Sequence, residues 1–256
     1  MGGFSTLGEG LTWEQVKQKL ETETDYKIKP YDDDLDGVLN WKALRFPDVR
    51  QSVLAEFTDP KILIATSSML DVYNSADKVE YAAGNISANS KELTIVGGTS
   101  TEAGNSWVYW NLPEDATKVY VKITMTCQHS AGEAAIDLCD DSGETLSNPP
   151  DFYKLLVKPK TALALGYFRL CKVVGGSETI LDTEDVDWSA GTYTTVEIFC
   201  NISTVKVWRD NVLKFSVGGD DANIPSIKSV RLRCNDESTS ATVSATFKGM
   251  IIIVYE

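Results

Sequence analysis

The chain has 256 residues, of which 43% are hydrophobic and 24% charged, which is the composition of a folded globular protein rather than a disordered one. Its formal net charge of −13 at pH 7 repels phosphate backbones, so nucleic acid is not an expected partner. No run approaches the roughly 18 apolar residues that a membrane span needs, so no membrane span is expected.

Residues 1–59 hold too few apolar side chains to form a core of their own. A capping box of Thr12 and Gln15 predicts a helix over residues 13–22, and a second short helix is predicted over residues 48–57. We interpret residues 1–59 as a small, partly helical extension that serves attachment or oligomerisation. Its first residues lack the pattern of a secretory signal peptide, so we expect a cytoplasmic protein or one carried in an assembled particle such as a virion.

Three alternating carboxylates, Asp32, Asp34 and Asp36, precede Gly37 and match the first half of a calcium-binding loop. Ala43 stands where a complete EF-hand needs a glutamate, so a full EF-hand is excluded. The three aspartates are candidate ligands of a weak Ca²⁺ site completed by other residues. The alternative is a solvated acidic turn.

From residue 60 to residue 256 the sequence becomes strand-like. Short stretches in which apolar and polar residues alternate are separated by turn signals such as Gly175-Gly176 and Asp210-Asn211, which is typical of an antiparallel sandwich. The predicted strands are 61–66, 69–73, 78–82, 92–96, 106–111, 117–127, 133–139, 154–158, 162–174, 178–182, 193–200, 203–208, 212–217, 227–234 and 243–254.

The alternation also predicts which side chains form the core of this sandwich. In residues 212–217 it places Leu213, Phe215 and Val217 on one side of a strand. The residues expected to be buried are Val196, Ile198, Val205, Val207, Phe215, Val230, Leu232 and Ile252.

The five cysteines have no CxxC spacing, which excludes a zinc knuckle or a thioredoxin-like motif. Each lies in or beside an apolar alternating run, so we expect buried, reduced thiols. The alternative is one cross-strand disulfide, with Cys127 and Cys139 as the pair.

The stretch that contains Gly175-Gly176, Trp188 to Ile198 and Val205 to Asn211 resembles the concanavalin A-like lectin and glucanase sandwiches, including the laminin-G-like modules. The resemblance extends over about residues 90–256. It implies an all-β, antiparallel two-sheet jelly-roll, with ligand contacts on the concave sheet or on edge loops.

Glucanases of this fold carry two carboxylates at alternate positions of one strand. Glu133 and Asp137 have a different spacing, and Asp185 and Asp187 lie in a turn-rich segment, so neither pair matches. His129 is the single histidine, and no GxSxG motif accompanies it. We therefore predict that the protein is not an enzyme.

Aromatic rings can stack on sugars, and three of them are candidate ligand-binding residues. Trp107 and Tyr109 share one face of a predicted strand, and Trp188 lies in a turn. The alternative is that these rings are part of the hydrophobic core.

Three functions remain compatible with these patterns. The first is a non-enzymatic structural and adhesive protein of a surface or virion-like assembly, with homo-oligomer or other assembly subunits as partners and glycans as ligands. The second is a carbohydrate-binding, lectin-like module that acts alone. The third, a glycoside hydrolase, rests on fold analogy only.

Overall fold

The computed structural model describes residues 61–66, 68–81, 86–97, 106–113, 116–141, 151–201, 203–218, 224–236 and 243–255. All of them belong to one compact unit, Ala55–Glu256. The predicted extension, residues 1–59, with Asp32, Asp34 and Asp36, lies outside the described residues. Its boundary, its helices and its Ca²⁺ site therefore stay predictions. None of the described helices is long and apolar enough to cross a membrane.

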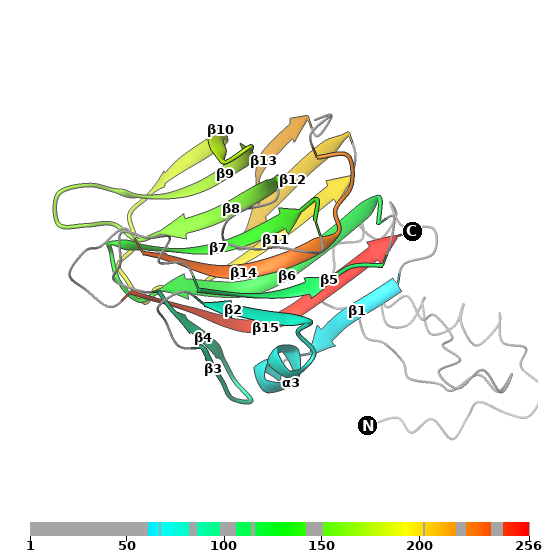
Figure 1. Ribbon diagram of the computed structural model, residues 1–256. Coiled ribbons are helices and arrows are strands. Elements are labelled where there is room, and N and C mark those ends of the chain that lie inside the picture. Colours follow the sequence, from blue (N-terminus) through cyan, green and yellow to red (C-terminus); the bar gives the residue numbers. More distant parts are fainter. Residues whose placement is uncertain are drawn as a thin grey trace, which may run out of the picture. The chain divides into compact units, whose positions relative to one another are not determined.

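The described residues form strands and one short helix (Figure 1). In chain order these are β1 Lys61–Thr66, α3 Met69–Asn74, β2 Lys78–Tyr81, β3 Ile86–Ala88, β4 Leu93–Val96, β5 Ser106–Asn111, β6 Lys118–Cys127, β7 Gly132–Cys139, β8 Phe152–Lys158, β9 Gly166–Val174, β10 Ser177–Val186, β11 Thr194–Asn201, β12 Thr204–Arg209, β13 Val212–Gly218, β14 Ser229–Asp236 and β15 Ser244–Tyr255.

The described strands build two antiparallel sheets that pack face to face (Figure 1). The eight-stranded sheet has the order β13-β12-β11-β6-β15-β4-β3, with β1 paired to β15. The seven-stranded sheet has the order β10-β9-β8-β7-β14-β5-β2. The predicted two-sheet antiparallel sandwich is thus confirmed.

The core lies between the two sheets, and alternate residues of each strand supply it. All eight side chains that the alternation predicts as buried are at most 3% exposed, and each belongs to this core. The five cysteines are all buried and free, so the prediction of reduced thiols is confirmed and no bond joins Cys127 to Cys139.

Residues 69–73, predicted as a strand, instead form helix α3. Ser68 caps the helix by accepting a hydrogen bond from the Asp71 amide, and Met69 and Val72 on one side are fully buried. Trp110 donates a hydrogen bond from Nε1 to the Val72 carbonyl at 3.2 Å. A capped turn with two apolar residues three positions apart outweighs the strand propensity of the segment.

The strand predicted over residues 162–174 begins later, at Gly166. Residues 159–165 form a loop in which Thr161 Oγ1 accepts hydrogen bonds from the amides of Leu163 and Ala164. A Cβ on Gly166 would lie 2.2 Å from the Lys158 carbonyl oxygen, so the close return of the chain requires glycine there.

The prediction that Leu213 faces the core with Phe215 is wrong. The register between β12 and β13 shifts next to Trp208, so Val207 pairs with Phe215 but Trp208 pairs with Leu213. Leu213 therefore lies on the outer face and is 52% exposed. The extra residue of this bulge is Lys214, whose Nζ lies 2.8 Å from Glu184 on the other sheet.

Side-chain truncation can test which residues of the eight-stranded sheet face the core and which face solvent. Ile198→Ala should lower the free energy of unfolding by about 2–5 kcal/mol, because it leaves a cavity in the core. Leu213→Ala, at an exposed position, should change it by less than about 0.5 kcal/mol. Urea unfolding would measure both, and equal losses would contradict the register described above.

Candidate functional site

The outer face of the seven-stranded sheet, which points away from the core, carries charged and aromatic side chains. On β14, Arg231 and Arg233 alternate with the core residue Leu232, and on β7, Glu133 and Asp137 share the face opposite Ile136. We call the following set the polar face: Trp107, Glu133, Asp137, Lys154, Tyr167, Glu178, Arg231, Arg233 and Asn235.

Asp137 lies at the centre of the polar face and is fully buried. Arg231 is its direct cross-strand neighbour and donates from Nε to Oδ2 at 2.7 Å. Arg233 donates from Nη2 to Oδ1 at 3.4 Å, and its Nε lies 3.0 Å from Oδ2. One carboxylate thus contacts two buried guanidinium groups.

These neighbours keep Asp137 ionised. Burial alone would raise the pKa of Asp137, but the charges of Arg233, Arg231 and Lys154 and the hydrogen bond from Arg231 outweigh it. The pKa therefore lies below its ordinary value of 3.8. Asp137 in turn raises the pKa of Arg231, against the effect of burial.

Glu133 is 5% exposed and accepts two hydrogen bonds. Tyr167 donates from its hydroxyl at 2.5 Å, and Asn235 donates from Nδ2 at 2.8 Å. Burial raises the pKa of Glu133, but these two bonds and the charges of Lys154 and Arg233 bring the pKa below its ordinary value. Glu133 is therefore also ionised at neutral pH.

The rest of the polar face holds these groups in place. Lys154 forms an ion pair with Glu178. The Arg231 guanidinium lies 4.8 Å from the centroid of the Phe152 ring and 5.6 Å from that of Trp107. Such contacts between a cation and an aromatic face add stability when they are desolvated.

Several polar atoms of this face have no hydrogen-bond partner. Among the described residues, four buried side-chain atoms lack one, and three of them are Trp107 Nε1, Arg233 Nε and Asn235 Oδ1. The short contact of Arg233 Nε with Asp137 is thus an ion pair that is not aligned for a hydrogen bond. Each such atom costs roughly 1–3 kcal/mol when nothing satisfies it.

These three residues are neighbours in the sheet. Trp107 pairs with Arg233 across β5 and β14, and Asn235 lies two positions further along β14. Diagonal neighbours of this kind are roughly 7–8 Å apart. The arrangement places two donors and one acceptor at neighbouring positions on one face of the sheet.

Of the three aromatic residues predicted to bind a ligand, Trp107 and Tyr109 lie together and Trp188 lies elsewhere. Trp107 and Tyr109 lie on the outer face of β5 but are only 2% and 4% exposed, so their rings offer no open stacking surface. Trp188 packs against the core after β10, and the Arg209 guanidinium lies 4.9 Å from its ring centroid. Trp188 Nε1 is the fourth buried atom without a partner.

Glu133 and Asp137 differ from the carboxylate pair of the glucanase pattern. They lie four residues apart on one face of β7 rather than at alternate positions of the strand. Both are ionised, so neither supplies a proton at neutral pH. Burial raises the pKa of Cys171 and of Cys200 to about 12, so these thiols are not nucleophiles either.

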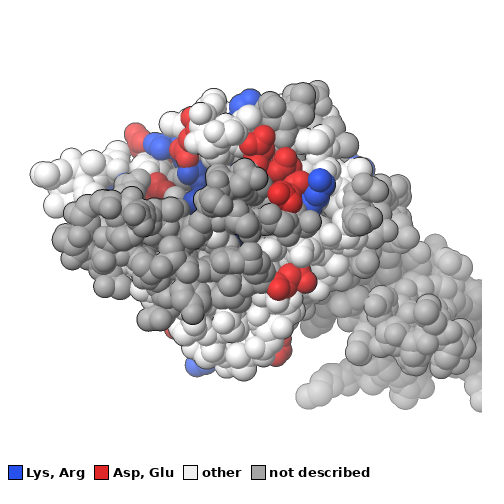
Figure 2. All heavy atoms as spheres, in the orientation of Figure 1, with Lys and Arg blue, Asp and Glu red and all other residues white. Residues whose placement is uncertain are grey.

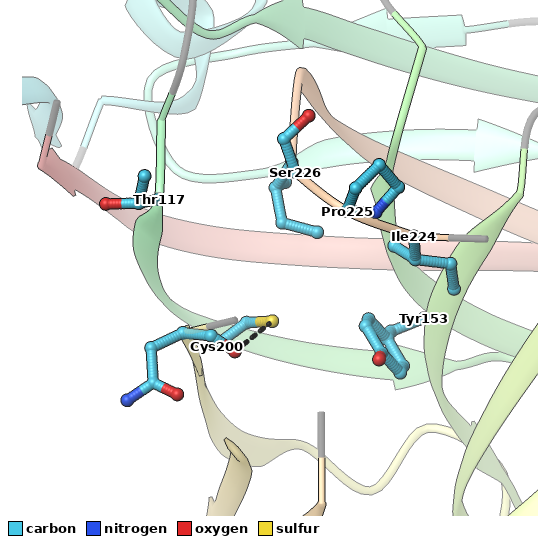
Figure 3. A pocket seen from close by; sticks show the side chains of 8 residues that line it. Thr117, Tyr153, Cys200, Ile224, Pro225 and Ser226 are labelled. Atoms are coloured by element: carbon cyan, nitrogen blue, oxygen red, sulfur yellow. Dashed lines mark hydrogen bonds between the residues drawn. The ribbon is translucent and has the colours of Figure 1, made fainter. Parts of the chain in front are cut away.

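A cavity beside Cys200 is too small for a sugar. Tyr153, Cys200, Ile224 and Pro225 line it, and its volume is about 10 Å³, roughly the room of one water molecule (Figure 3). The Cys200 thiol donates to the Asn201 carbonyl at 3.6 Å rather than to a ligand. Within the described part of the chain, no group of three or more His, Cys, Asp or Glu side chains could hold a metal ion.

Opposite charges also meet at the edges of the two sheets. Glu184 on β10 pairs with Arg209 on β12 at 2.6 Å and with Lys214 on β13 at 2.8 Å. Figure 2 shows acidic and basic side chains side by side in the upper part of the view, where β9, β10, β12 and β13 lie. These pairs join the two sheets and are half-buried.

Comparisons with known proteins place the fold. No family model and no curated protein matches the chain. The fold is similar to that of the carbohydrate binding module CBM66 from Bacillus subtilis, at 10% identity over 68% of this chain and 94% of that one, with a TM-score of 0.50. The chain has a concanavalin A-like jelly-roll fold.

Two further structures have a similar fold. The Emp47p carbohydrate recognition domain is 13% identical over 70% of this chain and 88% of that one, with a TM-score of 0.50. A native glycosidic hydrolase is 9% identical over 77% of this chain and 95% of that one, also at 0.50. Because binding proteins and an enzyme share the fold, the fold does not decide the function.

The polar face depends on Asp137, which a substitution can test. Asp137→Asn should lower the free energy of unfolding at pH 7 by about 3–5 kcal/mol, because Arg231 and Arg233 lose their buried counter-charge. Asp187→Asn, which breaks an exposed pair with Lys160, should cost less than about 1 kcal/mol.

The lowered pKa of Asp137 also predicts how the stability of the wild-type protein and of Asp137→Asn depends on pH. The pKa of Asp137 is lower in the folded than in the unfolded state, so its contribution is present above about pH 4 and is lost as pH falls further. Wild-type stability should therefore decline between about pH 4 and pH 2, more steeply than that of Asp137→Asn. Parallel curves from urea unfolding would contradict the assignment.

Proposed function

We propose that the protein is a non-enzymatic glycan-binding protein and that the polar face of the seven-stranded sheet is its binding surface. The observation that carries this proposal is the cluster of Trp107 Nε1, Arg233 Nε and Asn235 Oδ1, buried polar atoms that have no hydrogen-bond partner among the described residues, although Arg233 Nε forms an ion pair with Asp137. Native proteins seldom leave such atoms unsatisfied, so their grouping at one place points to a ligand or to ordered water.

Two features support binding rather than catalysis. Glu133 and Asp137 are ionised and already engaged in hydrogen bonds, so neither of them is an acid that could protonate a leaving group at neutral pH. Their fixed partners make the face rigid, and a preorganised set of hydrogen-bonding groups loses little entropy when a ligand binds.

Glycan binding should depend on Arg233. On an array of neutral and charged oligosaccharides, we expect wild-type protein to bind a subset and Arg233→Gln to weaken that binding by about 10-fold or more, because a charge-assisted hydrogen bond is lost. Lys206→Gln, the same charge change on β12 of the other sheet, is the control and should bind normally.

The same oligosaccharides test the absence of catalysis. Prolonged incubation should release no new reducing ends. Release that disappears in Glu133→Gln would overturn the non-enzymatic proposal.

A second role, as a subunit of a homo-oligomer or of a surface or virion-like assembly, is favoured by the loop of residues 159–165. Leu163 at its tip is 98% exposed and Leu165 is 55% exposed. The loop extends at the left of Figure 1, where the protrusion at the left of Figure 2 is mostly uncharged. Internal hydrogen bonds hold it, so it presents ordered apolar side chains to solvent, as interaction sites do.

Removing the apolar tip should reduce assembly. The double variant Leu163→Ser and Leu165→Ser loses two side chains worth roughly 1.5–3 kcal/mol each when buried, so sedimentation velocity should show a shift to smaller species than wild type. Val212→Ser, at a position that is 55% exposed in another hairpin, is the control. An identical size distribution for all three proteins would contradict the assembly role of this loop.

A further inference from the structure

The unsatisfied atoms of the polar face form a mixed set of donors and an acceptor. Trp107 Nε1 and Arg233 Nε carry hydrogens, whereas Asn235 Oδ1 is an acceptor. The Asn235 amide cannot be turned round without loss, because its Nδ2 donates to Glu133, whose ionised carboxylate only accepts. The acceptor character of the free oxygen therefore follows from the chemistry of its neighbour.

The ion-paired side chains around these atoms carry equal numbers of opposite charges. Lys154, Arg231 and Arg233 contribute three positive charges, and Glu133, Asp137 and Glu178 contribute three negative ones. Lys158 and Arg169 lie beside the Tyr167 ring at one end of the polar face. A charged ligand at the ion-paired centre would add an unpaired charge to a buried site, which is costly. The net charge of −13 over the whole chain further disfavours anionic ligands.

The polar face is least buried at one end. Asn235 and Tyr167 are half-buried, and Arg233 is 8% exposed, whereas Asp137 and Trp107 lie deeper at 0% and 2%. The Arg169 guanidinium lies 3.8 Å from the centroid of the Tyr167 ring and covers one side of it. A ligand of the cluster would therefore have to approach from the side of Arg233 and Asn235.

We infer that the ligand of this site, which rests on the proposed glycan-binding function, is an uncharged sugar unit held by its hydroxyl groups. A hydroxyl is the small neutral group that both accepts and donates. Hydroxyl oxygens accept from Trp107 Nε1 and Arg233 Nε, and a hydroxyl hydrogen is donated to Asn235 Oδ1. Bidentate recognition of a carboxylate would leave the Asn235 acceptor unsatisfied.

The chain offers a matched pair of tryptophans to test this subsite. Trp107 and Trp110 both lie on β5, but Trp110 faces the core, and its Nε1 donates to Val72 and to Ser75 at 3.2 Å each. Trp107→Phe and Trp110→Phe remove the same ring volume. Trp110→Phe also removes hydrogen bonds within the protein, whereas Trp107→Phe removes a donor that has no hydrogen-bond partner among the described residues.

The two variants should separate stability from binding. Trp110→Phe should have a melting temperature about 2–4 °C below that of Trp107→Phe, because only Trp110 loses a hydrogen bond within the protein. Trp107→Phe should weaken the dissociation constant for neutral hexose oligosaccharides about 10-fold, and Trp110→Phe should leave it unchanged, as measured by calorimetry. Unchanged sugar affinity in Trp107→Phe would overturn the subsite.

A comparison of ligands distinguishes this inference from the function on which it rests. Wild-type protein is titrated with neutral hexose oligosaccharides and with uronic-acid oligosaccharides of equal length. Binding of the neutral series by at least 10-fold over the acidic one is the expected result. Preference for the acidic series would overturn the inference and leave glycan binding standing, whereas binding of neither would overturn glycan binding itself.

Discussion

The buried carboxylate of Asp137 is the shared counter-charge of two arginines around which the outer face of the seven-stranded sheet is built. Its two oxygens contact Arg231 and Arg233, which β14 places opposite β7. The Arg231 guanidinium then lies over the rings of Phe152 and Trp107, which join β8 and β5 to the same cluster. Because charges in this setting are stable only as a compensated set, the position of each side chain depends on the others.

The alternation of apolar residues was sufficient to predict the sandwich and its core. Val196 and Ile198 on β11 are buried as expected, because a period of two leaves no other way to hide both. The alternation gave wrong predictions where a β-bulge or a helix cap changes the local structure. Leu213 faces solvent because of one extra residue in β13, and residues 69–73 are helical because Ser68 caps them. The bulge depends on the pairing with β12, which a short sequence window does not contain, whereas the Ser68 cap lies directly before the helix and is a signal that the sequence does contain.

The polar face was less predictable than the core. Arg231 and Arg233 alternate with Val230 and Leu232, which places them on the outer face, but sequence reasoning expects such arginines in water. Their burial follows from the register that brings Asp137 opposite Arg231, a pairing of residues 94 positions apart. The aromatic residues attract attention in the sequence, yet the unpartnered nitrogen of Trp107 is informative only once its neighbours are known.

The roles proposed for the polar face and for the exposed loop are compatible, because weak binding at one site can be strengthened by assembly. A site whose groups are already engaged with one another gains only a few new hydrogen bonds from a sugar, so a single copy should bind weakly. If the loop that carries Leu163 joins several copies, the second and later contacts become intramolecular, and avidity can exceed single-site affinity by about 10²–10⁴. If both proposals are correct, a weak site for neutral sugars and an apolar attachment loop would complement each other, because assembly would supply the affinity that a single site lacks.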